Sequence, residues 1–272
     1  MSLVVAAVAG VLIGLSLGAL GGGGSILAVP VLVHLLGQTP TQATTGSLVV
    51  VAATSLIGAI SARRTVMLGR GLVFSGTAVG GALLGAHAST KVSDDVLLAA
   101  FSVLMLGIGV LMVVRQVRRA RGGAADREPY PRIDDPIITF FPTFACDCPQ
   151  AAKVLVTATA VGLLTGFLGV GGGFLVVPAL LLALNLPLRQ ATSTSLVVIT
   201  VTSLVALAGR AGSGVAPDWG VVLLLTVTSC LAAIAGTALA RRTDTARLSG
   251  AFTALVLVVA GFTASQALPA LA

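Results

Sequence analysis

One segment of the chain occurs twice. The residues from Gly14 to Leu56 align without a gap on Gly162–Leu204. Each copy contains a glycine-rich run, Gly21–Ser25 in the first half and Gly169–Gly173 in the second, followed by a proline and a Q-A-T-x-x-S sequence. In an apolar chain, a duplicated unit that glycine and proline interrupt at matching positions indicates a membrane transporter, with its binding site at the interruptions.

The composition places the chain in a lipid bilayer. It is 56% hydrophobic and 9% charged, with a mean hydropathy of +1.07, whereas soluble domains carry about 25% charged residues. Many glycines and few aromatics favour close-packed helices over a barrel. The apolar start, without basic residues, predicts a retained first segment rather than a signal peptide. The net charge of +7 is confined to the flanks of apolar runs, so we expect no nucleic-acid partner.

The pattern predicts ten apolar helical elements, five in each half. The first half contains Leu3–Leu20, Ser25–Leu36, Gln42–Ala62, Gly71–Thr90 and Val96–Val114. The second half contains Lys153–Leu168, Gly173–Leu184, Ala191–Arg210, Trp219–Ala240 and Ala246–Leu268. The later elements also match across the halves, since Gly85 and Phe101 correspond to Gly236 and Phe252 after a shift of about three residues.

Two of these elements are too short to cross a bilayer. Ser25–Leu36 and Gly173–Leu184 allow only about 18 Å of helix, and a span needs about 20 residues. We predict that each is a half-helix that follows a glycine-rich hairpin. The expected fold is an all-α polytopic membrane protein. Its first repeat is 1–114, its connecting loop is 115–152 and its second repeat is 153–272.

The distribution of Lys and Arg predicts the orientation. Taken along ten elements, 14 of the 16 basic residues fall on one side, and only Lys91 and Arg210 fall on the other. The rich side is expected to be cytoplasmic, which places the central loop in the cytoplasm, both termini outside and the protein in the inner cell membrane. Because five elements per repeat is an odd number, the two repeats are predicted to be inverted, with their half-helices meeting near the midplane.

This arrangement predicts an anion site. Helix N-termini carry about half a positive charge and unpaired N–H donors, and glycine lets the backbone approach a ligand closely. Hydroxyl and amide side chains follow each hairpin and are expected to add donors. The alternative is that the glycines serve helix packing and that the Ser and Thr hydroxyls bond to their own helices. The candidate substrate-binding residues are Gly22, Gly23, Gly24, Ser25, Gln42, Thr44, Thr45, Ser47, Gly171, Gly172, Gly173, Gln190, Thr192, Ser193, Thr194 and Ser195.

The repeated motif resembles the sulfite exporter TauE/SafE family. The second copy carries the likeness best, as G-F-L-G-V-G-G-G-F-L-V-V-P from Gly166 to Pro178 and Q-A-T-S-T-S-L from Gln190 to Leu196. The first copy departs from it at Gly22 and at Gly46, so the two half-sites are unequal. The resemblance implies transport of small sulfur-containing anions such as sulfite, organosulfonates or thiosulfate, without giving the direction, and we expect an exporter. We expect no enzymatic activity, because the predicted spans contain no acid–base pair, metal cluster or nucleophile–base constellation.

Two other functions stay open at this point. Cys146 and Cys148 form a C-x-C sequence in the central loop, which is compatible with a membrane sulfur-relay or redox protein. No further metal ligands lie nearby, so free thiols, no metal and no cofactor are expected. A passive anion channel is the second alternative, because all nine acidic residues lie in connections and the buried carboxylates of a proton relay are missing.

The remaining features are assigned to structure. His34 and His87 lie near predicted helix ends and are expected to be structural, and Cys230 is expected to pack within a helix. The segment from Gly76 to Gly85 contains overlapping G-x-x-x-G spacings, which predict a close-packing face within the bundle or between protomers. A homodimer therefore remains open.

Overall fold

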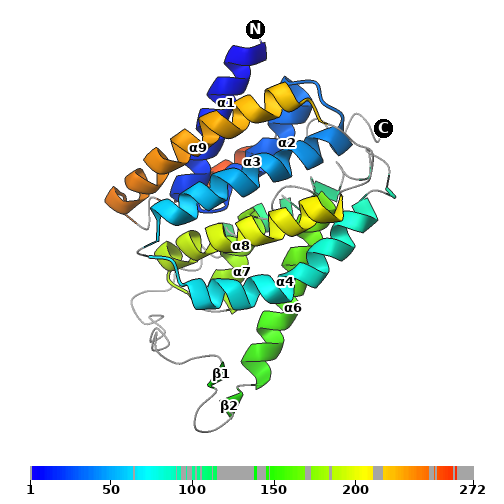
Figure 1. The fold of residues 1–272 in the computed structure, drawn as a ribbon. Helices are drawn as coiled ribbons and strands as arrows, with labels where there is room; N and C mark the ends of the chain where they lie inside the picture. Colours follow the sequence, from blue (N-terminus) through cyan, green and yellow to red (C-terminus); the bar gives the residue numbers. More distant parts are fainter. Residues whose placement is uncertain are drawn as a thin grey trace.

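A computed structural model of the protein shows a helical bundle (Figure 1). Its elements are α1 (Ser2–Leu20), α2 (Gly23–Pro30), the π-helix η1 (Val31–Leu35), α3 (Pro40–Ser61), α4 (Leu68–Ser89), β1 (Ile138–Thr139), β2 (Ala145–Cys146), α6 (Cys148–Leu168), α7 (Gly173–Ala183), α8 (Leu188–Gly209) and α9 (Trp219–Arg242). The structure describes residues 2–63, 65–89, 91–92, 96, 100–101, 103–104, 106–111, 113–114, 138–139, 145–146, 148–168, 173–183, 186–210, 217–244, 248, 250–259 and 261. Every described position in 96–114 and in 248–261 is helical.

The expected all-α polytopic architecture is confirmed. Four described helices are long and apolar enough to cross a membrane: α3, α4, residues Arg189–Gly209 of α8, and α9. The only strands among the described residues are β1 and β2, a two-residue antiparallel pair in which Ile138 faces Cys146. The helix starts at α2, α3, α4 and α8 lie two or three residues before the predicted ones, and the largest difference is at α6, which begins at Cys148 rather than Lys153.

The outward faces of the long helices are apolar. On α9, Leu223, Val227 and Leu231 are 58%, 57% and 67% exposed, and their spacing of four residues places them on one face. The opposite face buries small and polar residues, including Ser229 and Ala233. This distribution is the reverse of that in a soluble protein, and it fits a helix whose outer face contacts lipid.

Helices α1 and α9 pack backbone against backbone, although they come from opposite ends of the chain. A Cβ atom added at Gly14 would lie 2.1 Å from the carbonyl oxygen of Ser229, and one added at Gly18 would lie 2.3 Å from that of Ala233. Any larger residue would push the helices apart, so this crossing requires glycine.

The α4–α6 pair repeats this contact with the halves exchanged. Cβ atoms added at Gly162 and Gly166 would lie 2.1 and 2.0 Å from the carbonyl oxygens of Ala78 and Ala82. The alignment matches α6 with α1 and α4 with α9, and the residues in contact also match. The same contact therefore occurs twice, each time between the first helix of one copy and the fourth element of the other.

Between these pairs, α3 and α8 form the centre of the bundle. Helices α9, α3, α8 and α4 lie side by side in that order (Figure 1). The hydroxyls of Ser55 and Thr200 are 2.9 Å apart across α3 and α8. Those of Thr54 and Ser229 are 2.8 Å apart across α3 and α9. Such bonds between membrane helices contribute about 0.6 kcal/mol each, so they orient α3 more than they stabilise it.

The two central helices have matching ends. Each has 22 residues, and each ends in a single residue of similar backbone geometry: Ala62 after α3, with φ −90° and ψ 8°, and Arg210 after α8, with φ −95° and ψ −5°. The turns before them also match, because the N–H of Gln38 donates to Leu32 and that of Leu186 donates to Leu180. The duplication therefore extends to the backbone hydrogen bonds.

The short helices agree with the predicted half-helices. Helix α2 passes into η1 at Pro30, which has no N–H to continue the α-helical ladder, and together they run only from Gly23 to Leu35. Helix α7 has 11 residues. Neither reaches the length of a span.

The G-x-x-x-G segment of α4 is used partly within the bundle. A Cβ added at Gly81 would lie 2.3 Å from the carbonyl oxygen of Thr159, and one added at Gly85 would lie 2.0 Å from that of Leu163. Gly76 and Gly80 are exposed, with no described atom near their Cβ positions. The homodimer stays a prediction.

The other predicted structural residues lie as follows. His34 and His87 are exposed, in the last turns of η1 and α4. Cys230 is partly buried within α9, where its sulfur lies 4.0 Å from the hydroxyl of Thr54. Cys146 lies in β2 and Cys148 begins α6, and their side chains are outside the described part of the structure.

Candidate functional site

The amino-terminal ends of the two half-helices meet. A Cβ atom added at Gly173, the first residue of α7, would lie 2.7 Å from the hydroxyl oxygen of Ser25 and 2.9 Å from the Cα of Gly22. Gly22 is the residue that precedes α2. Two helix ends of positive potential therefore touch within the bundle. The predicted site residues Gly171 and Gly172 lie outside the described residues.

The first glycine run is tightly packed on both sides. Gly21 has φ +74°, and an added Cβ would lie 2.4 Å from the carbonyl oxygen of Thr192. At Gly24, an added Cβ would lie 2.1 Å from the carbonyl oxygen of Ile13. At Gly23 the nearest atoms are the side chains of Leu20 and Leu255, at 3.0 and 3.1 Å. Packing therefore requires Gly21 and Gly24, while Gly23 has more freedom.

Most of the predicted hydroxyl donors bond to their own helices. Five of them donate to the carbonyl oxygen three residues earlier, at 2.7–3.0 Å: Ser25, Thr44, Ser47, Thr192 and Ser195. Thr45 donates in the same way to the carbonyl four residues earlier. These side chains present lone pairs to their surroundings, so donation to an anion requires the hydroxyl to rotate away from its helix.

Two hydroxyls at the start of α8 hold the segment between α3 and α4. Ser193 donates to the carbonyl oxygen of Thr65 at 2.9 Å. Thr194 accepts from the N–H of Met67 at 3.1 Å. These bonds fix the 62–67 connection against α8, so Ser193 and Thr194 have structural partners in addition to any role in binding.

The two matched glutamines differ. Gln42 forms a capping box at the start of α3, accepting from the N–H of Thr39 at 3.3 Å while Thr39 accepts from its N–H at 3.4 Å. The side-chain oxygen of Gln190 is buried and has no hydrogen-bond partner among the described residues. Of the pair, Gln190 is the one with unused hydrogen-bonding capacity.

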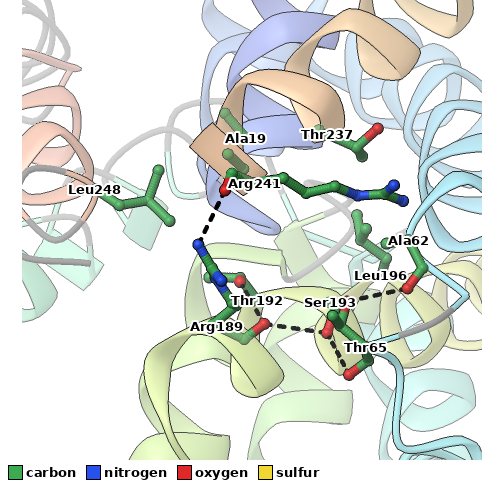
Figure 2. Close-up of a pocket in the computed structure, with 12 residues that line it drawn as sticks. Ala19, Ala62, Thr65, Arg189, Thr192, Ser193, Leu196, Thr237, Arg241 and Leu248 are labelled. Atoms are coloured by element: carbon green, nitrogen blue, oxygen red, sulfur yellow. Dashed lines mark hydrogen bonds between the residues drawn. The ribbon is translucent and has the colours of Figure 1, made fainter. Parts of the chain in front are cut away.

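A cavity of about 60 Å³ lies beside Thr192 and Ser193, where α1 and α9 meet the start of α8 (Figure 2). At ~10–15 Å³ for each water, it has room for roughly four to six waters. Its lining includes two arginines and no carboxylate. The lining residues are Gly18, Ala19, Ala62, Thr65, Arg189, Thr192, Ser193, Leu196, Thr237, Ala240, Arg241 and Leu248. Thr192 and Ser193 are thus the predicted site residues that the structure places at a cavity.

Both arginines of the lining are tied to neighbouring helix ends. Arg189 donates to the carbonyl oxygen of Arg241 at 3.2 Å, as Figure 2 shows. Arg241 in turn donates to the carbonyl oxygen of Ser61, the last residue of α3. Both guanidinium groups are exposed. They create a positive entrance in front of Thr192 and Ser193.

The opposite end of α8, about 30 Å away at 1.5 Å per residue, contains a buried arginine. Arg210 is only 5% exposed. Its guanidinium donates to the hydroxyl of Thr44 at 2.7 Å and to the carbonyl oxygens of Gly166 and Phe167 at 3.1 and 3.3 Å. In the sequence, Arg210 was noted only as the end of the predicted element Ala191–Arg210 and as one of the two basic residues on the side with few positive charges. The sequence feature that could have singled out Arg210 is its alignment with Ala62, because only the second copy has a charged residue at this position.

Comparisons with known proteins agree with this architecture. Residues 6–263 match the family described as Sulfite exporter TauE/SafE. A "Probable membrane transporter protein" of Xylella fastidiosa strain 9a5c is 30% identical over 264 residues, which cover 95% of this chain and 94% of the relative. The "Probable membrane transporter protein YunE" of Bacillus subtilis strain 168 is 30% identical over 217 residues, 75% of this chain and 76% of the relative. No solved structure matches the chain.

The family match covers both copies of the repeated motif, the meeting half-helices and the cavity. It confirms the resemblance that the motif indicated. The chain therefore belongs to the sulfite exporter TauE/SafE family.

Proposed function

We propose that the protein exports small sulfur-containing anions, such as sulfite or organosulfonates, across the inner cell membrane by alternating access. The observation that supports this most strongly is the contact between the amino-terminal ends of α2 and α7, next to a cavity whose lining has Arg189 and Arg241 but no carboxylate. Family membership supports the transporter class. The chemistry of the site supports the anionic substrate.

The electrostatics of this region favour negative charge. Helix N-termini attract anions through their dipoles and free N–H groups, and Gly22 and Gly173 bring two such ends together. The only described carboxylates, Asp218 and Asp244, are both exposed. Asp218 is engaged in capping α9, where it accepts from the N–H of Gly220 at 3.0 Å. An anion in the cavity therefore meets positive potential without a nearby competing carboxylate of the described chain.

The matched contacts of the two halves support alternating access. The α1–α9 and α4–α6 contacts are the same contact with the halves exchanged, as expected when a two-fold axis relates two inverted repeats. The cavity lies at one end of α8, and at the other end, which we treat as the filled one, Arg210 bonds to Thr44 and Gly166, the described counterparts of the lining residues Thr192 and Gly18. In this proposal the open end faces the cytoplasm, where the exposed arginines follow the positive-inside rule. Exchange of the open and filled ends carries the substrate across.

A passive anion channel is the competing function, and a gradient experiment separates the two. Purified protein in liposomes is tested for flux of sulfite, thiosulfate, sulfoacetate, taurine, sulfate and bicarbonate, with protein-free liposomes as the control. We expect flux of one or more sulfur anions and trans-stimulation, meaning faster uptake of labelled anion when the same unlabelled anion is inside. Saturable flux with trans-stimulation is specific to a carrier. Flux that only dissipates gradients supports the channel, and absence of flux for every sulfur anion contradicts the proposed substrate.

A further inference from the structure

Arg210 has no counterpart in the other copy. The residue that follows α3 is Ala62, and it ends its helix with the same backbone geometry as Arg210. An arginine is therefore not needed to terminate this helix. Its presence in one copy calls for another explanation, and its surroundings supply one.

The guanidinium of Arg210 is buried among neutral oxygens. Its described partners are two hydroxyls, of Thr44 and, at 3.5 Å, of Thr45, and two carbonyls, of Gly166 and Phe167. Its Nε–H is buried and has no hydrogen-bond partner among the described residues. A buried cation is costly unless it is paired and fully hydrogen-bonded. This one forms no ion pair with the described carboxylates, Asp218 and Asp244, and its Nε–H is available to donate to a ligand.

The side chain of Arg210 lies among described residues that match the lining of the cavity at the other end. The cavity there is lined by Gly18, Ala19, Thr192, Ser193 and Ala62. Four of the corresponding residues here bond to Arg210, namely Thr44, Thr45, Gly166 and Phe167. Opening of this end therefore requires the guanidinium to leave its neutral acceptors, which exposes a positive charge to whatever enters.

We propose that Arg210 binds the transported anion at this end of the protein, exchanging its bonds to Thr44 and the last carbonyls of α6 for charge-assisted bonds to the anion, with its Nε–H and one Nη–H as the donors. Arginine is suited to this role because its planar fork binds two oxygens of an oxyanion together. In the absence of an anion, the same group closes this end. The inference rests on the proposed function for the direction of transport, but it requires only that the ligand is an oxyanion.

The test compares Arg210→Gln and Arg210→Lys with Arg242→Gln, a control at an exposed arginine that does not line the cavity. Liposome flux, binding and thermal stability are measured with sulfite, thiosulfate and sulfate as probes. We expect Arg210→Gln to raise KM at least tenfold while its Tm stays close to that of the wild type. Arg210→Lys is expected to recover part of the affinity, because it keeps the charge but loses the fork. Arg242→Gln should behave as the wild type does.

A second measurement covers the case in which Arg210→Gln does not fold. In wild-type protein carrying ¹⁵N-labelled arginine, the Nε–H signal of Arg210 is assigned by its loss in Arg210→Lys and followed during titration with each probe. A shift that saturates with the measured Kd supports direct binding. A purely structural clamp predicts an unchanged Nε–H signal, and reduced Tm with normal KM in the variants; either result overturns the inference. If sulfate shifts the signal but no sulfur anion is transported, the proposed substrate fails and the Arg210 site stands.

Discussion

The two ends of the α3–α8 pair are built from matched residues, yet one end is open and the other is filled. At the open end, Thr192 and Ser193 lie beside a cavity of about 60 Å³ next to Ala62. At the filled end, Thr44 lies 2.7 Å from the guanidinium of Arg210. The residues that end the two helices have nearly the same backbone geometry. Among the described side chains, Arg210 in place of Ala62 is the difference that adds a buried charge.

This comparison shows how a duplicated unit becomes asymmetric. If both copies carried alanine after the central helix, both ends would contain a space, and nothing would distinguish an open end from a closed one. In the proposed mechanism, the arginine closes one end through bonds that can be broken and replaced by bonds to an anion. An alternating-access carrier must close one end while the other is open, and under this mechanism Arg210, which has no counterpart in the other copy, is the residue that does so.

The largest expected effect is in a labelling experiment that tests which end faces the cytoplasm, because each cysteine is either labelled or not labelled. Single cysteines at residues 122 and 272, which lie outside the described part of the structure, are expected on opposite sides of the membrane, with residue 122 inside. An impermeant thiol reagent applied to intact cells should label only the cysteine at 272. Labelling of both from the same side would contradict the orientation and the inverted repeats.

Making the two ends alike should block transport. In Ala62→Arg, the introduced side chain points a bulky cation at the open cavity, which is large enough for only a few waters. We expect flux to fall more than about tenfold, with a stability cost of about 1–3 kcal/mol from overpacking. Ala62→Ser is the matched control and should keep most of the flux. Normal transport by Ala62→Arg would show that the cavity is not on the substrate path.

Adjacent glycines of the first hairpin should separate packing from binding. Gly24→Ala places a Cβ 2.1 Å from the carbonyl oxygen of Ile13, whereas Gly23→Ala meets only flexible side chains at 3.0 and 3.1 Å. We expect a loss of about 1–3 kcal/mol in stability for Gly24→Ala and a smaller change for Gly23→Ala. Thermal unfolding in detergent is measured beside anion affinity.

Bulky residues at Gly23 are expected to abolish binding in a protein that inserts, and the same is predicted for Gly171 and Gly172. At Gly24, by contrast, a substitution should lower stability and affinity together, because the added side chain meets the backbone of α1. If affinity follows stability at Gly23 as well, the anion site at the hairpins is wrong.

The hydroxyls at the two ends should have modest and unequal effects. Thr192→Ala and Thr44→Ala each remove one neutral hydrogen-bonding group, which is worth about 0.5–1.5 kcal/mol or roughly two- to tenfold in affinity. Thr192→Ala is expected to lower the affinity for anion that enters from the cavity. Thr44→Ala is expected to change the affinity at the other end, because it removes a hydrogen-bond acceptor of Arg210. Ser47→Ala and Ser195→Ala should fall in the same range. Affinities measured from each side of oriented liposomes test this, and equal effects from both sides would argue against distinct ends.

The smallest effect is expected in the central connection. Replacing Cys146 and Cys148 together with serine should leave flux within about twofold, because no described cluster of metal ligands exists and neither copy of the repeat contains the pair. Loss of flux in a folded double variant would instead favour the sulfur-relay function.

Much of the fold follows from the sequence because its determinants are local. Hydropathy limits the chain to membrane helices, and the lengths of Ser25–Leu36 and Gly173–Leu184 exclude full spans. The glycine-rich runs mark the hairpins, and the duplication shows that they occupy equivalent places. The choice of Thr192 and Ser193 as candidate site residues was possible for the same reason, since they and their counterparts Thr44 and Thr45 follow the glycine-rich runs of the two copies.

Contacts across the bundle could not be predicted from the sequence, and they bear on the candidate site residues. Hydroxyls such as Ser47 and Ser195 satisfy their own helices, because a carbonyl three residues away is always within reach, whereas a ligand is not. Gly24 is fixed by the backbone of α1, a contact that the glycine motif alone does not distinguish from ligand approach.

The sequence by itself determined a duplicated, all-helical membrane protein with two short helices and a concentration of arginines on one side. Only the tertiary structure decided that the amino-terminal ends at Ser25 and Gly173 touch, that Arg189 and Arg241 border a cavity, and that Arg210 is buried against Thr44. The physical reason is distance along the chain. Hydropathy and helix length are properties of neighbouring residues, but the surroundings of Arg210 come from helices more than 40 residues away in sequence, and packing alone brings them together.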